Sequence, residues 1–295
     1  MNIRIGTRGS TLALWQSEYV MHEMQKRYPE HTYETVIIKT KGDRIQTVAL
    51  DKIGDKGLFV KEIEEQLLTG SIDIAVHSMK DMPSNLPQGL VFSKSLKRED
   101  ARDVLILKED SDLQTLKKGA RIGTGSKRRA IQLKALRPDL TIVDIRGNLD
   151  TRLQKLQTEA YDGIVVAAAG VKRLGMESMI NYYFKVEEMI PASAQGTLAI
   201  EVREDRQDLL ALLDPMGDED TEQCILAERN FLQAIGGSCH IPVGAHCIKQ
   251  DAYYTLYAIY GEGDRSQSCI ITGTHPRDMG ILAAEKLKRA MEITG

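Results

Sequence analysis

The sequence predicts an α/β fold with two similar α/β domains followed by a small α+β domain. Short apolar strand-like segments alternate with helix-like segments through most of the 295 residues, which is typical of βαβ units on a mostly parallel sheet. The tetrapeptide Arg-Ile-Gly-Thr occurs at 4–7 and again at 121–124, each time between a strand-like segment and a serine that can start a helix. The last quarter reads differently, as a helix, a group of strands and a second helix.

The first domain is expected to comprise residues 1–96 and 197–214. It begins with a strand over 2–6, and Ser10 is a good N-cap for a helix that Pro29 ends. The chain is expected to pass through the second domain and then to add a strand over 197–202, which completes the first sheet. The other elements expected here are a strand over 32–40, a helix from about 58 to 68, a strand over 72–75 and a helix near 208–213.

The second domain is expected over 102–190 and the third over 219–295, with 86–103 a charged loop between the first two. The second domain should repeat the strand-to-helix turns of the first. Its expected elements are strands over 104–107, 141–145 and 162–169, with helices ending at 136 and containing Arg152. The third domain should have a helix over 221–234, strands over 243–248, 253–260 and 268–272, and a helix over 277–291.

Composition excludes several classes of protein. A net charge of −3 argues against nucleic-acid binding, because there is no basic excess to neutralise a phosphate backbone. No apolar run approaches the ~20 residues that a membrane span needs. The N-terminus enters a strand without a secretory apolar region, which predicts a cytoplasmic protein. In that compartment the four cysteines are expected to be thiols and not disulfides.

A polar motif follows the buried strand over 72–75. His77, Ser78, Lys80 and Asp81 crowd its carboxyl end, and Pro83 prevents the strand from continuing. Ligands of open α/β sheets bind at the carboxyl ends of the strands, so the Lys80–Asp81 pair is placed for chemistry. The alternative is a simple turn in which Asp81 caps the next segment.

Cations gather at the same kind of position. Seven cationic residues lie just past strand ends or in the first turn of the next helix, namely Arg8, Lys80, Arg128, Arg129, Arg146, Arg152 and Arg173. Cations along the carboxyl-end edge of the sheets predict a cleft for a ligand with several carboxylates or phosphates, because arginine pairs bidentately with both groups. The alternative is scattered surface charge. As a carboxylate among cations, Asp81 would pair with an arginine or stabilise positive charge on the substrate.

Cys239 lies in a Gly-Gly-Ser loop, which favours an accessible sulfur. We expect covalent use of this thiol, with an inert buried cysteine as the alternative. A metal site formed by Cys239, His240, His246 and Cys247 fits no standard zinc spacing, so no metal is expected. Cys224, Cys247 and Cys269 fall on amphipathic elements and are expected in the core.

Several sequence motifs follow one another in a characteristic order. They are Gly6–Ser10 with Leu12–Gln16, Lys56–Phe59, His77–Asp81, Gly123–Thr124 with Arg128–Arg129, Arg146–Asn148 with Thr151–Leu153, Ala167–Gly170 and Gly236–Cys239. In these motifs the chain resembles the hydroxymethylbilane synthase (porphobilinogen deaminase) family over essentially its full length. The resemblance implies two periplasmic-binding-protein-like α/β domains around a cleft plus the small α+β domain. It also implies a monomer and a transferase that joins four porphobilinogens with release of ammonia, giving hydroxymethylbilane for haem biosynthesis.

The resemblance implies a role for each matching residue. Asp81 would be catalytic, binding pyrrole N–H groups and stabilising a cationic azafulvene. Cys239 would carry a dipyrromethane cofactor through a thioether. The cofactor carboxylates would be held by Lys80, Ser126, Arg128, Arg129 and Arg146. Substrate or the growing chain would be bound by Arg8, Ser10, Gln16, Arg146, Arg152, Arg173 and Gln195. Lys52 and Lys56 would lie in a mobile loop over the cleft.

The sequence departs from the family pattern at Gly125 and Lys127, where Ser and Leu are usual, and at Ala194, where glycine is usual. The first departure puts one hydroxyl contact to the cofactor in doubt. If position 194 needs a positive φ, alanine there would be strained. Two other functions also fit an anion cleft between α/β domains: a solute-binding protein that performs no chemistry, and a different transferase with a catalytic thiol.

Overall fold

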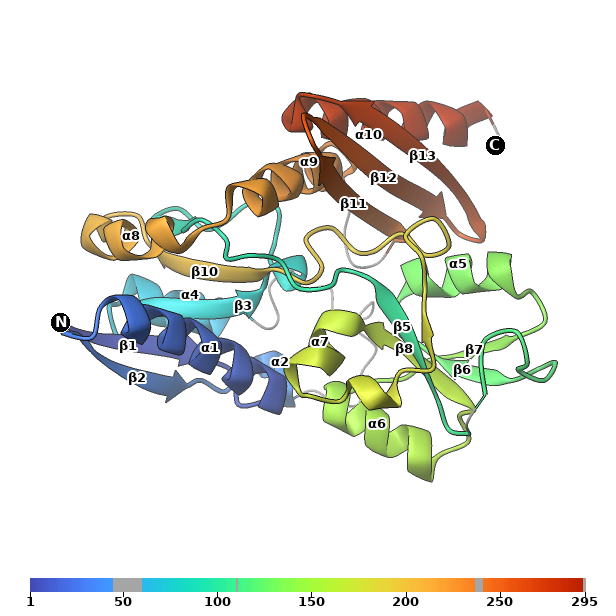
Figure 1. Cartoon of the computed structure of the whole chain (residues 1–295), viewed down its shortest axis with the longest axis horizontal. Helices are drawn as coiled ribbons and strands as arrows, with labels where there is room; N and C mark the ends of the chain where they lie inside the picture. Colours follow the sequence, from blue (N-terminus) through green and yellow to red (C-terminus); the bar gives the residue numbers. More distant parts are fainter. Residues whose placement is uncertain (45–59, 110, 237–240, 294–295) are drawn as a thin grey trace. The chain divides into compact units, whose positions relative to one another are not determined.

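The computed structural model describes residues 1–44, 60–109, 111–236 and 241–293 (Figure 1). The chain forms two compact units. The first contains residues 1–98 and 197–222, and the second contains 99–196 and 223–295. The expected division into domains at 1–96 with 197–214, 102–190 and 219–295 stays a prediction.

The sheet of the first unit has the strand order β2-β1-β3-β10-β4. Its strands are β1 (Asn2–Thr7), β2 (Thr32–Ile37), β3 (Ile74–Ser78), β4 (Leu90–Phe92) and β10 (Leu198–Arg203). Strands β2, β1 and β3 are parallel, whereas β10 runs antiparallel to both of its neighbours. Four of the five strands therefore run in one direction, as expected for a mostly parallel sheet, and only the returning strand β10 is reversed. The short strand β4 was missed inside the expected loop over 86–103.

Helices cover both faces of this sheet. The helices of this unit are α1 (Thr11–Arg27), α2 (Lys41–Arg44), α4 (Lys61–Leu68) and α8 (Gln207–Leu213), with short 3₁₀ turns η1 (Met79–Asp81) and η3 (Asp214–Met216). Residues of α1 and α8 pack on one face and residues of α4 on the other. As predicted, Ser10 caps α1, and its side chain accepts a hydrogen bond from the backbone N–H of Ala13. Ile74 and Val76 pack into one apolar cluster, and Ala75 packs into another with residues of α4.

The sheet of the second unit repeats the same arrangement, in the order β7-β6-β8-β5-β9. Its elements are β5 (Asp103–Leu107), β6 (Arg121–Gly123), α5 (Lys127–Leu136), β7 (Thr141–Val143), α6 (Leu149–Thr158), β8 (Gly163–Ala167), α7 (Ala168–Arg173), η2 (Glu177–Met179) and β9 (Tyr182–Tyr183). The repeated tetrapeptide contributes to β1 in one sheet and to β6 in the other, each in second place. In both sheets the fourth strand is antiparallel to its neighbours. The predicted repeat is confirmed.

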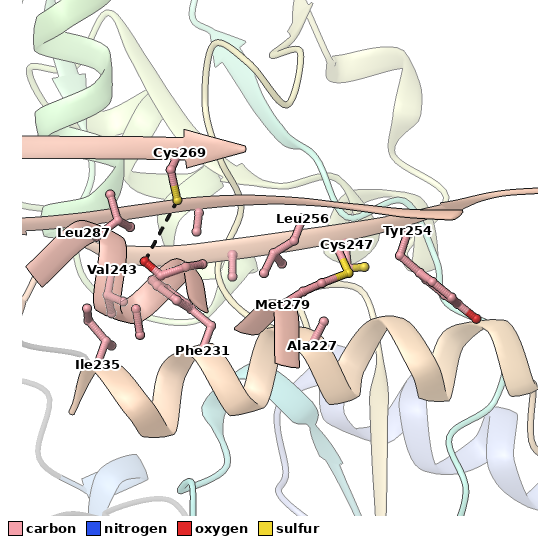
Figure 2. Packing of buried hydrophobic residues seen from close by; sticks show 14 of the residues in the cluster. Ala227, Phe231, Ile235, Val243, Cys247, Tyr254, Leu256, Cys269, Met279 and Leu287 are labelled. Atoms are coloured by element: carbon pink, nitrogen blue, oxygen red, sulfur yellow. Dashed lines mark hydrogen bonds between the residues drawn. The ribbon is translucent and has the colours of Figure 1, made fainter. Parts of the chain in front are cut away.

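The remaining elements form the predicted α+β arrangement. They are α9 (Glu219–Ile235), β11 (Val243–Gln250), β12 (Tyr253–Glu262), β13 (Arg265–Gly273) and α10 (Pro276–Ile293). Both β11 and β13 pair with β12 in antiparallel fashion, and α10 lies along this sheet (Figure 1). Figure 2 shows Cys247 and Cys269 among the buried side chains between α9 and the sheet. Cys224 belongs to the same cluster, so all three of these cysteines are core residues, as predicted.

None of the helices in the described residues is long and apolar enough to cross a membrane.

A cluster of ionisable side chains is buried between α4 and the sheet of the first unit. His77 Nε2 lies 3.3 Å from Glu201 Oε2, and Glu64 of α4 is only 6% exposed. Within the described residues, both oxygens of Glu201 and Glu64 Oε1 lack a hydrogen-bond partner. Burial, and then the charge of Glu201, raise the pKa of Glu64 to about 7. The cluster therefore contributes a pH-dependent term to the stability of this unit.

We expect the free energy of unfolding to fall as pH rises from about 4.5 to about 7, because the folded state keeps the Glu64 proton that the unfolded chain has released. The variant Glu64→Gln should lose this slope, which amounts to at most about 3 kcal/mol. Urea unfolding at pH 5 and pH 8 measures it. Glu65→Gln, at the exposed neighbouring position on the same helix, is the control and should keep the wild-type slope. Equal slopes in both variants would contradict the assignment.

Candidate functional site

Asp81 lies in a short turn that is fixed on both sides. The turn η1 directly follows β3, and the backbone N–H of Met79 donates to the carbonyl of Thr197 next to β10 at 3.0 Å. Met79 and Met82 are buried, whereas Lys80 is half-buried and Asp81 is exposed. The carboxylate of Asp81 makes no hydrogen bond or ion pair to the part of the chain that the structure describes. The buried methionines anchor the turn and present Asp81 at its surface.

The first turns of α1 contribute to the same end of the first sheet. Gln16 is 3% exposed, and its Nε2 donates to Ser78 Oγ at 3.1 Å. The structure thus brings Gln16 next to the residue that starts the Asp81 turn. Ser10 uses its hydroxyl oxygen to cap the helix, at 3.3 Å from the N–H of Ala13. Arg8 is half-buried just before it.

In the second unit, Arg128 and Arg129 surround one buried carboxylate. Asp103 of β5 is 0% exposed. Arg128 Nη1 donates to Asp103 Oδ2 at 2.6 Å, and Arg129 Nε donates to Oδ1 at 3.0 Å. Arg129 also donates from Nη1 to the carbonyl of Val165 at 3.0 Å. Burial alone would raise the pKa of Asp103, but the two guanidinium groups outweigh burial and hold that pKa well below its usual range.

The two arginines differ in what they leave for a ligand. Every nitrogen of the Arg129 guanidinium lies within hydrogen-bond reach of Asp103 or Val165. Arg128 uses only Nη1, which also donates to the carbonyl of Ile190. Its Nε and Nη2 find no acceptor among the described residues. These two nitrogens form the edge with which arginine binds a carboxylate bidentately, so Arg128 fits a ligand carboxylate better than Arg129 does.

Three further cations lie at helix ends of this unit. Arg146 pairs with Asp144 at 3.1 Å. Arg152 Nε donates to the carbonyl of Gly147 at 2.9 Å, and Arg173 Nη2 donates to that of Gly196 at 2.7 Å. Both contacts orient a guanidinium group through a backbone carbonyl, and the charge of Arg173 also helps to lower the pKa of Glu99.

Ser126 has a structural role that the sequence also predicts. It is the N-cap of α5, and its Oγ accepts a hydrogen bond from the N–H of Arg129 at 3.4 Å. Gly125, just before it, is explained by close packing. A Cβ at this position would lie 2.9 Å from Asp144 Oδ1 and 3.2 Å from the carbonyl oxygen of Ile145, so serine would force a local shift.

The segment over 190–196 connects these groups to the rest of the second unit. Gln195 is 0% exposed, and its Nε2 donates to Asp103 Oδ1 at 2.9 Å and to the carbonyl of Ala101 at 2.7 Å. Ala194 has a φ of 60°, which confirms that this position needs a positive φ. Its N–H donates to the buried carboxylate of Glu228 at 2.5 Å, and this bond holds the unfavourable backbone in place.

Several predicted residues lie outside the described ranges, namely Lys52, Lys56, Cys239 and His240. Within the described ranges, no group of three or more His, Cys, Asp and Glu residues could hold a metal ion. Sequence reasoning missed Asp103. Its signal was present, because it is an acidic residue at the start of an otherwise apolar strand that ends up buried, and such a charge requires a partner.

Comparison with known families gives matches along most of the chain. The family model for the porphobilinogen deaminase dipyrromethane cofactor binding domain matches residues 3–211. The model for the porphobilinogen deaminase C-terminal domain matches residues 222–289.

Similar proteins carry the same family name. A porphobilinogen deaminase of Clostridioides difficile (strain 630) is 53% identical, with 99% of each chain covered. One from Geobacillus kaustophilus (strain HTA426) is 48% identical over 96% of this chain and 93% of that protein. Among solved structures, the methionine binding protein MetQ has a TM-score of 0.47 at 14% identity, covering 77% of this chain and 94% of that one. The two matching sheet orders and the separate three-stranded sheet confirm the predicted fold class of two similar α/β sheets plus a small α+β part.

Replacing Ala194 by glycine should leave the free energy of unfolding nearly unchanged. The relief of about 1–2 kcal/mol of left-handed strain offsets the buried methyl group, worth about 0.8 kcal/mol, and the extra freedom of the unfolded chain. Ala120→Gly is the matched control, because Ala120 is 0% exposed and is not among the positive-φ residues. It should lose about 1–2 kcal/mol. Urea unfolding of both variants checks this, and equal losses would show that Ala194 is unstrained.

Proposed function

Because the chain belongs to the porphobilinogen deaminase family, we propose that Asp81 is its catalytic carboxylate and Cys239 the attachment point of its cofactor. The protein is a transferase of tetrapyrrole biosynthesis. It joins four molecules of porphobilinogen head to tail, releases ammonia, and gives hydroxymethylbilane on the way to haem. Family membership excludes the alternatives of a binding protein without chemistry and of an unrelated transferase.

Positive charge develops on the substrate during the reaction, and the carboxylate of Asp81 stabilises this charge. When ammonia leaves porphobilinogen, the remaining carbon and pyrrole ring carry the charge until a second pyrrole attacks and a proton is lost. A carboxylate close to the ring accepts hydrogen bonds from pyrrole N–H groups and lowers the energy of this cation. The observation that carries the proposal is the Asp81 turn, in which buried methionines on either side hold an exposed carboxylate with no partner among the described residues.

The substrates and products are polycarboxylates, because every pyrrole carries an acetate and a propionate group. The cofactor of this family is dipyrromethane, and it supplies the anchored end to which substrate pyrroles are added. Its acidic groups suit the donor set of the second unit, where Arg128 keeps the Nε–Nη2 edge and Ser126 starts α5. We assign cofactor binding to Lys80, Ser126, Arg128, Arg129 and Arg146.

Substrate binding is assigned to the remaining predicted residues. They are Arg8, Ser10, Gln16, Arg146, Arg152, Arg173 and Gln195. Support for these roles comes from their positions at strand ends and helix starts, and from the contacts with backbone carbonyls that orient the guanidinium groups of Arg152 and Arg173. A mobile loop containing Lys52 and Lys56, a monomeric state and a cytoplasmic location stay predictions from the sequence.

The mass of the intact protein should exceed the sequence mass by one two-pyrrole adduct. Cys239→Ser should remove the adduct, because a serine hydroxyl does not form the thioether. Cys269→Ala is the control, since Cys269 is 8% exposed in the core of the C-terminal sheet, and this variant should keep the adduct. Intact-protein mass spectrometry measures all three. An active wild-type protein of unmodified mass would refute the attachment.

Asp81→Asn should keep the fold and lower turnover by about two to three orders of magnitude. At ~4 Å and an effective dielectric constant of ~20, two unit charges interact by roughly 4 kcal/mol, and each 1.4 kcal/mol is tenfold in rate. Steady-state assays of porphobilinogen consumption measure the loss. Asp205→Asn changes an exposed carboxylate of the same unit that pairs with surface Arg203 and should stay within about twofold of wild type. Near-normal turnover of Asp81→Asn would rule out the role.

A further inference from the structure

The buried carboxylate of Asp103 is surrounded by four nitrogen donors. An ionised carboxylate offers about four lone-pair sites. Oδ2 accepts from Arg128 Nη1 at 2.6 Å, and Oδ1 lies 3.0 Å and 2.8 Å from Nε and Nη2 of Arg129. Gln195 Nε2 provides the fourth donor, at 2.9 Å from Oδ1. Each of these donor residues carries a proposed role toward the cofactor or the growing chain, whereas Asp103 itself is 0% exposed.

These contacts join three segments of the second unit, and a fourth segment packs against them. Asp103 opens β5, Arg128 and Arg129 lie in the first turn of α5, and Gln195 lies in the segment over 190–196. The fourth segment is β11, because a Cβ on Gly244 would lie 2.6 Å from Arg128 Cδ and 2.4 Å from the carbonyl oxygen of Pro191. Gly244 follows Cys239 by five positions in the sequence. The strand that comes next in the chain after Cys239 therefore packs directly on the arginine that Asp103 orients.

The charges in this group do not cancel. Arg128 and Arg129 bring two positive charges and Asp103 brings one negative charge, so one positive charge remains in a buried position. A buried charge without a counterion is costly, and an incoming carboxylate on the Nε–Nη2 edge of Arg128 would relieve that cost. Asp103 thus fixes the direction of this edge and also reduces the charge that an anion must neutralise.

We propose that Asp103 is a positioning residue, which sets the geometry of Arg128 and Arg129 for the carboxylates of the cofactor and that of Gln195 for the growing chain. The proposal rests on the proposed function of these three residues. Asp103 has no contact with the ligand and acts through its donors.

Substitutions at Asp103 separate geometry from charge. The change Asp103→Asn keeps the shape of the side chain but turns one acceptor into an N–H donor that faces a guanidinium group. In Asp103→Glu the charge is retained and displaced by one methylene, which moves both arginines. Both variants should require more porphobilinogen to load the apo-protein, with the half-loading concentration raised at least about tenfold for Asp103→Asn and about threefold or more for Asp103→Glu.

The experiment uses full-length protein produced without porphobilinogen. Porphobilinogen is titrated in at low temperature, and the fraction carrying the two-pyrrole adduct is measured by intact-protein mass spectrometry beside circular dichroism of the same sample. Ile106→Ala is the control, because Ile106 is 1% exposed in a core cluster of the same strand β5. It should lower the melting temperature and keep the wild-type half-loading concentration, as expected for a purely structural change.

Folded Asp103→Asn or Asp103→Glu protein with the wild-type half-loading concentration would overturn the proposal. If Asp103→Asn does not fold, Asp103→Glu decides alone. The proposal would also be overturned if Ile106→Ala shifted the loading curve as far as the Asp103 variants do. A wild-type protein that never gains the adduct would instead refute the attachment at Cys239, so the two failures are distinguishable.

Discussion

The contact on which most of the second unit depends is the buried ion pair between Asp103 and two arginines. An isolated guanidinium group cannot be buried at acceptable cost, and neither can an isolated carboxylate. Here the strand, the helix and the segment over 190–196 must all come together before any of these charges is satisfied. Such a group contributes little net stability compared with apolar packing, but it permits only one arrangement of its members. The result is an arginine edge with a defined direction at the start of a helix.

The first unit solves the opposite problem, because it must keep a carboxylate exposed and still in place. Met79 and Met82 bury their side chains on either side of Lys80 and Asp81, and the backbone of Met79 is bonded to the residue that precedes β10. Just before this turn in the chain, His77 is buried with Glu64 and Glu201 between α4 and the sheet. The exposed carboxylate of Asp81 is therefore held by a turn whose neighbouring residues are buried in the core.

Much of this arrangement could be predicted from local sequence signals. Ser10 was recognisable as the start of a helix, and the repeated tetrapeptide indicated two related sheets. The antiparallel direction of β10 could not be predicted from local signals, because it depends on which distant strands β10 pairs with. Asp103 was missed because its partners are far away in sequence, and the hydrophobic periodicity that predicts helices and strands does not show which charged residues are buried. The strain at Ala194 was expected only through the resemblance to a family with glycine there, and its φ of 60° confirms it.

The position of β10 in its sheet has a consequence for how the protein is made. This strand, Leu198–Arg203, lies between β3 and β4, so the first sheet stays split until the ribosome has added about two-thirds of the chain. Every strand of the second sheet lies between Asp103 and Tyr183, and that sheet can be completed while the first still has an open edge. Until β10 is made, the nascent chain therefore has an unpaired edge at β3, and an edge of this kind is prone to pair with other chains.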